Sequence, residues 1–170
     1  MFRCRCWLFI VVMCLPSTTV TAQDAEILTD SQIIHIVYTA GQIDTAAANL
    51  ALKNSSNNVV RDFANVTLRD YAAAYTVAAS LIAKLNINPQ DNAISRSLAG
   101  AAAEHAQRLS KLSGGDFDKA YIQNELAFYV FISGALEVTL IPSAQNSEIK
   151  SLLQNELALI RHYQIMVRNL

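Results

Sequence analysis

The stretch DSQIIHIVYTAGQIDTAAANLALK (residues 30–53), followed by NSSNN (residues 54–58), decides the fold of this chain. In the first part, apolar side chains recur at intervals of three and four, which is the spacing of an amphipathic helix. The polar run after it is short, so the next helix must return antiparallel to the first. That second helix is predicted at 58–85 and ends at the run NINP, residues 86–89. This half of the chain therefore predicts a helical hairpin.

The second half of the chain predicts another hairpin. A weaker helical stretch at 93–112 precedes two helices predicted at 116–140 and 147–169, and Pro142 interrupts the chain between them. Alanine is abundant, whereas the whole sequence has only 5 glycines and 3 prolines, a composition that favours helix. Two hairpins joined by a long connection form a ferritin-like four-helix bundle with an extra crossover helix. We therefore predict an all-α fold of this type, with an up-down five-helix bundle as the alternative.

The first residues have the pattern of a secretory signal peptide. A short stretch containing Arg3 and Arg5 is followed by the apolar residues 8–15, which are too few to span a bilayer, and then by small residues. We expect residues 1–22 to be the signal peptide and residues 23–170 to form a single helical-bundle domain. The mature protein is expected to be exported, to the periplasm or in association with an outer membrane.

All three cysteines, Cys4, Cys6 and Cys14, lie in the predicted signal peptide, so the mature domain has no disulfide to stabilise it. The alternatives to cleavage are an uncleaved anchor and lipid attachment at Cys14. No later segment was expected to be long and apolar enough to span a membrane. Loss of Arg3 and Arg5 with the signal peptide changes the net charge from −1 to −3, which does not favour nucleic acid as a partner.

Polar side chains fall on or near the apolar faces of the predicted helices. The resulting candidates for a metal site are Asp44, Asp70, Tyr71, Tyr129, Glu156 and His162. Ferritin-like bundles hold two metals through inward carboxylates and Glu-x-x-His pairs, but this chain has no Glu-x-x-His. The alternative is that buried acids bond to tyrosine hydroxyls, which satisfies both groups without a metal. His35 is predicted on the outer face of its helix, and Tyr75 on the same inner face as Tyr71.

Several runs of residues, in this order, resemble an exported bacterial family catalogued as domain of unknown function 4142. They are Val60-Arg61-Asp62-Phe63-Ala64, Arg69-Asp70-Tyr71, the run LSGGDFDKAY at 112–121, the run LIPSAQN at 140–146, and His162. The resemblance covers about residues 30–168. It implies a ferritin-like helical fold in the periplasm or at the outer membrane, with no established activity for most members.

The resemblance also implies how the family's polar pattern maps onto this chain. It places a family glutamate at Asp44, an Asp-His pair at Asp70-Tyr71, a second histidine at Tyr129 and a late histidine at His162. Two of the three family histidines are therefore tyrosine here. If those histidines bind metal in relatives, the resemblance implies that this chain has weakened or lost that ability.

These observations leave three functional hypotheses. The first is a non-catalytic exported bundle with a role in envelope stress or in binding a protein partner. The second is a protein that binds iron or another divalent metal through a degenerate ferritin-like site. The third is a carrier of a small ligand, because alanine-rich faces can leave room between helices. We expect no enzyme activity, no cofactor, no nucleic-acid partner and no membrane span in the mature chain, which is expected to be a monomer or weak homo-oligomer.

Overall fold

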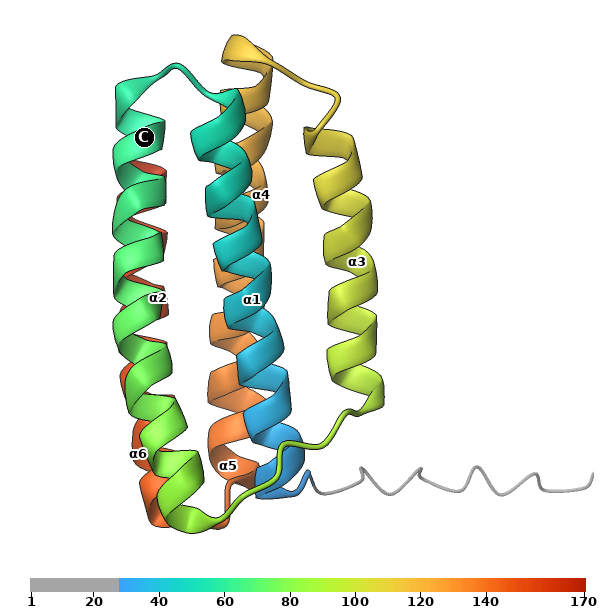
Figure 1. Cartoon of the computed structure of the whole chain (residues 1–170), viewed down its shortest axis with the longest axis vertical. Coiled ribbons are helices and arrows are strands. Elements are labelled where there is room, and N and C mark those ends of the chain that lie inside the picture. The colour runs from blue at the N-terminus through green and yellow to red at the C-terminus, as the bar shows by residue number, and fades with distance from the viewer. Residues whose placement is uncertain (1–27) are drawn as a thin grey trace, which may run out of the picture.

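The computed structural model describes residues 28–170, and this part of the chain is helical throughout apart from short connections (Figure 1). The elements are α1 (Asp30–Asn54), α2 (Asn58–Leu85), α3 (Ala93–Leu109), α4 (Gly114–Ala135), the π-helical turn η1 (Leu136–Leu140), α5 (Ile141–Ser143) and α6 (Ser147–Arg168). The prediction of an all-α fold is confirmed. The predicted signal peptide and its cleavage site lie outside the described residues.

Four long helices form the sides of a bundle. α1 packs against α2 and α4, and α6 packs against the same two helices from the opposite side. The chain runs along α1, returns along α2, and then alternates again through α3, α4 and α6, as the colours of Figure 1 show. α3 lies outside this set of four and packs against α1 and α4. The arrangement agrees with the prediction of two hairpins joined by an additional helix.

The start of α1 is fixed by polar contacts. Its N-cap is Thr29, which forms a capping box with Gln32, so the neighbouring Asp30 does not cap the helix. The Asp30 carboxylate instead accepts hydrogen bonds from the backbone N–H groups of Gln145 and Asn146, at 2.8 and 3.0 Å. These bonds hold the beginning of the bundle to the connection that precedes α6.

The helix that begins at α4 does not break where the sequence predicted. Helical geometry continues through η1 and α5 as far as Ser143, so Pro142 lies inside the last turn and does not separate two elements. Proline has no N–H and its ring clashes with the carbonyl four residues earlier, so regular α-helical bonding cannot be maintained at this position. The π turn just before it, in which the Ile141 N–H donates to the Leu136 carbonyl, is one way to adapt the helix to this constraint.

One helical segment, Gly114–Ser143, has the length and apolar composition of a membrane span, with 30 residues and a hydropathy of 1.6. The sequence was expected to contain no such segment after the signal peptide, and that expectation was wrong. The same segment packs against α1 and α6 in the bundle and buries Tyr121, Glu125 and Tyr129 there. A core helix of a bundle meets the same criteria of length and composition, so these criteria alone do not place it in a membrane.

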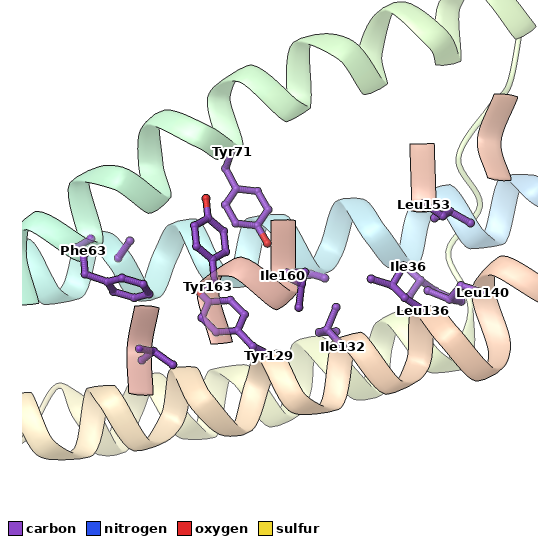
Figure 2. Packing of buried hydrophobic residues seen from close by; sticks show 14 of the residues in the cluster. Ile36, Phe63, Tyr71, Tyr129, Ile132, Leu136, Leu140, Leu153, Ile160 and Tyr163 are labelled. Carbon is purple, nitrogen blue, oxygen red and sulfur yellow. The ribbon is translucent and has the colours of Figure 1, made fainter. Parts of the chain in front are cut away.

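The buried core is distributed unevenly along α2. Tyr71 is the last buried residue of this helix, although the helix continues to Leu85. Beyond Tyr71 the ribbon of α2 diverges from that of α1 (Figure 2). The prediction that Tyr75 lies on the inner face is therefore wrong, because 56% of this residue is exposed. The apolar side chains of the second half of α2, among them Leu81, Ile82 and Leu85, are only partly buried against the core.

Candidate functional site

Asp44 lies at the centre of a polar cluster inside the bundle. It is fully buried on α1, and the Tyr129 hydroxyl on α4 donates to its two carboxyl oxygens, at 2.9 and 3.1 Å. Tyr71 reaches the same carboxyl group from α2. The rings of Tyr71, Tyr129 and Tyr163 converge between the helices in Figure 2. The prediction that Tyr71 and Tyr129 are buried is confirmed.

Glu125 is a second fully buried acid, one helical turn before Tyr129. Its carboxyl group is within hydrogen-bonding reach of the Asp44 carboxyl group. Its Oε1 accepts a hydrogen bond of 3.3 Å from Asn124, whereas its Oε2 has no hydrogen-bond partner. Glu125 is not among the candidate site residues predicted from the sequence. The spacing of Tyr121, Glu125 and Tyr129 at intervals of four is the signal that identifies it.

Burial controls the ionisation of this pair. Desolvation raises the pKa of Asp44, although hydrogen bonds from its neighbours oppose the shift. Desolvation also raises the pKa of Glu125 well above its usual value, and the nearby charge of Asp44 raises it further. Two adjacent acids in such a setting favour a state in which one of them keeps its proton and donates to the other.

Burial also affects the tyrosines around these acids. Burial raises the pKa of Tyr71, Tyr121 and Tyr129 above that of a free phenol, and the nearby carboxyl groups raise it further. The hydroxyl groups therefore keep their protons at neutral pH.

Glu156 extends the cluster toward α6. Its side chain is half-buried and its carboxyl group contacts the Tyr71 hydroxyl. Burial raises the pKa of Glu156 to about 7, and the charge of Asp44 contributes to the shift. Tyr71 thus lies between two acids, Asp44 on the inside and Glu156 on the side that faces a groove.

Asp70 and His162, which are predicted candidates for the same metal site as Asp44, do not contact the Asp44 carboxyl group. Asp70 is partly exposed, where it pairs with Arg69 at 2.8 Å and accepts a 3.3 Å hydrogen bond from the Tyr163 hydroxyl. His162 is exposed on α6, and the next residue, Tyr163, occupies the buried position. Because a helix turns by about 100° per residue, only one of two neighbouring side chains can point directly into the core.

The cluster does not have the donor set of a ferritin-like metal centre. Within residues 28–170 no group of three or more His, Cys, Asp or Glu side chains is arranged to hold a metal ion. Both oxygens of Asp44 are already occupied by the Tyr129 hydroxyl. The carboxyl groups of Asp44 and Glu156 both lie in this region, but Tyr71 separates them. The two acids that are directly paired are Asp44 and Glu125.

An apolar groove of about 1000 Å³ runs between α1 and α2 and reaches Leu152 and Glu156 of α6. The wall on α2 consists largely of small side chains, namely Ala72, Ala74, Ala78, Ala79 and Ala83. Beyond Tyr71, these side chains are too short to fill the space between the two diverging helices. The groove follows from this alanine-rich face, because small side chains leave space between the two helices.

Aromatic and polar side chains line the rest of the groove. Tyr38 and Tyr75 form a tilted pair across it, with ring centroids 5.8 Å apart. Gly41 allows the ring of Tyr71 to press against α1, because a Cβ at this position would lie 3.2 Å from that ring. His35 lines the groove and has a buried Nδ1 without a hydrogen-bond partner, so its predicted place on the outer face was wrong.

A second apolar groove, of about 840 Å³, lies between α1, α3 and α4. Phe128 and Phe131 line it together with many alanines. Unlike the groove beside Glu156, it has no acidic side chain in its wall. The two grooves therefore share an apolar character and differ in charge.

No curated protein and no solved structure matches this chain. The match that exists is to a family model described as a domain of unknown function (DUF4142), and it covers residues 15–170. The match spans nearly the whole chain, including every helix of the bundle. The chain therefore belongs to the DUF4142 family.

Proposed function

We propose that this protein is a non-catalytic, exported binding protein that carries a small apolar molecule in the groove between α1 and α2. The observation that supports the proposal is the groove itself, an apolar space of about 1000 Å³ that has a carboxyl group, that of Glu156, in its wall. Its volume is at the upper end of the range for small-molecule sites in proteins. Most of its wall is apolar, and Tyr71 and Glu156 are among the polar side chains that line it, a combination found in many ligand sites.

The buried cluster around Asp44 has a structural role in this proposal. Its acids and tyrosines come from different helices, and their hydrogen bonds join α1 to α4 within the core. Buried polar groups of this kind must be paired to be tolerated, and the pairs then fix how the helices pack. The cluster holds Tyr71 in place, and Tyr71 forms the inner end of the groove.

Export is the second part of the proposal, and it is supported by the signal-peptide pattern of residues 1–22. Mass spectrometry of the protein recovered from its native compartment tests this part. We expect a mature chain that begins at Gln23. A lipid-modified chain that begins at Cys14 would contradict it.

Binding to the groove can be tested with N-phenyl-1-naphthylamine, an apolar dye that fluoresces when it leaves water. We expect saturable binding to the native protein. Ala78 lines the groove, so Ala78→Phe should fill it and abolish the signal. Ala73 lies on the same helix but is exposed and does not line the groove, so Ala73→Phe is the matched control. Unchanged binding in Ala78→Phe, or no binding to the native protein, would rule out the groove as a ligand site.

A further inference from the structure

We infer that the groove between α1 and α2 selects molecules that combine an apolar body with a protonated amine, and that the carboxylate of Glu156 receives the amine. This inference rests on the proposed function, because it names the class of ligand that the same groove takes. It follows from the charges around the groove, the position of Glu156 and the aromatic pair in the wall.

The acids at the inner end of the groove have no basic partner. The ion pairs within residues 28–170 join Arg69 to Asp70, Lys84 to Glu148, Arg96 to Asp91 and Arg161 to Glu137. None of these pairs includes Asp44, Glu125 or Glu156. The wall of the groove contains no lysine and no arginine either. Within the described residues no lysine or arginine pairs with these acids, so a ligand of positive charge would complement an ionised carboxylate here.

Among these acids, Glu156 is the one that a ligand can reach. Its side chain lines the groove, whereas Asp44 and Glu125 are buried behind Tyr71 and line no part of it. The Tyr71 hydroxyl contacts Glu156 from one side only, so the carboxylate retains acceptor positions toward the groove. An ammonium group with three donors can use these positions.

The rest of the groove suits the remainder of such a molecule. The alanines of α2 offer a smooth apolar wall, and Tyr38 and Tyr75 present aromatic rings that attract cations as well as hydrocarbon. A ligand with a carboxylate head would meet repulsion at Glu156. A carboxylate head could contact His35 instead, which also lines the groove. His35 lies six residues along α1 from Gly41, the residue against which Tyr71 packs, or about 9 Å at 1.5 Å per residue.

Displacement of bound N-phenyl-1-naphthylamine by decylamine, decanol and decanoate at pH 7.5 tests the inference. These compounds share one chain length and differ in the charge of the head. We expect decylamine to bind about tenfold more tightly than decanol, as one partly buried ion pair allows. Decanoate should bind most weakly.

Substitutions then assign the preference to one residue. Glu156→Gln should reduce decylamine binding to the level of decanol, and Glu156→Asp, which keeps the charge, should retain a preference for the amine. Glu104 is exposed on α3 and lines neither groove, so Glu104→Gln is the control that should change nothing. Circular dichroism of each variant shows whether the bundle is still folded.

The outcomes separate this inference from the proposed function. Equal binding of decylamine and decanol, both abolished by Ala78→Phe, would overturn the amine preference and leave the groove as an apolar site. Tightest binding of decanoate, or an amine preference that persists in Glu156→Gln, would also overturn the inference. Failure of every compound to bind the native protein would remove the proposed function itself.

Discussion

Replacing Tyr129 by phenylalanine should destabilise the bundle by about 1.5–3 kcal/mol, the range for a buried hydrogen bond to a charged or otherwise unpaired group. The hydroxyl that is lost donates to both oxygens of Asp44, and both residues are fully buried. The ring remains, so its packing against Phe63 and Tyr163, at centroid distances of 6.5 and 5.4 Å, is retained. The loss of stability in Tyr129→Phe therefore reports the missing hydrogen bond and not a cavity in the core.

The cost of Tyr129→Phe should also depend on pH. The hydrogen bond from Tyr129 lowers the pKa of Asp44, because it favours the ionised carboxylate. Removing the bond raises that pKa further. Compared with the native protein, the variant should therefore lose more stability at pH 8, where the Asp44 carboxyl group tends to ionise, than at pH 5, where it tends to stay protonated.

Urea unfolding followed by helical circular dichroism measures these effects. A double-mutant cycle with Asp44→Asn should give a coupling free energy of about 1 kcal/mol or more between the two positions. Tyr75→Phe is the control, because this side chain is exposed and should change stability by less than about 0.5 kcal/mol. A loss below about 0.5 kcal/mol in Tyr129→Phe, or no coupling to Asp44, would refute the reasoning.

Burial raises the pKa of Glu156 to about 7. The raised pKa contributes fully to the stability of the folded protein below about pH 4, and this contribution is lost as the pH rises through 7. The free energy of unfolding, measured with urea, should therefore depend less on pH between pH 4 and 8 in Glu156→Gln than in the native protein. Tyr71→Ala should cost about 3–5 kcal/mol against less than about 1 for Tyr75→Ala in the same assay, and similar costs would contradict the divergence of α2. The double variant Tyr71→His and Tyr129→His should take up more zinc than the native protein in a titration, because imidazole is a neutral ligand near pH 7; equal uptake would contradict the idea that tyrosine has replaced a ligand.

Much of the fold can be predicted from local signals in the sequence. α2 begins and ends where the polar runs on either side of it indicate, and Asn86 stops it in a left-handed conformation with φ 52°. Tyr71 and Tyr129 lie on faces that a period of 3.6 residues identifies correctly. Such signals depend only on neighbours in the chain, so they are present before any packing is known.

The parts that the sequence does not predict depend on contacts between distant elements. A helical wheel gives the direction of a side chain but does not show which half of a long helix has a partner, so Tyr75 was placed inside although α2 diverges there. Small errors in the assumed turn per residue also exchange neighbours. They placed His162 near the apolar face of its helix, although it is exposed, and they left Glu125 out of the candidate site residues, although it is fully buried.

The divergence of α2 after Tyr71 has a consequence for how the bundle moves. The second half of this helix contributes no fully buried residue. Leu81, Ile82 and Leu85 are only partly buried against the core, and the Tyr38–Tyr75 pair and the exposed ion pair of Lys84 with Glu148 add further contacts. Opening of this half exposes less apolar surface than opening of the first half, so we expect its free energy to lie below that of global unfolding. We expect amide hydrogens there to exchange earlier than those around Phe63. The bundle thus has a rigid end built on the acid–tyrosine cluster and a compliant end that can widen around a guest without disturbing the first.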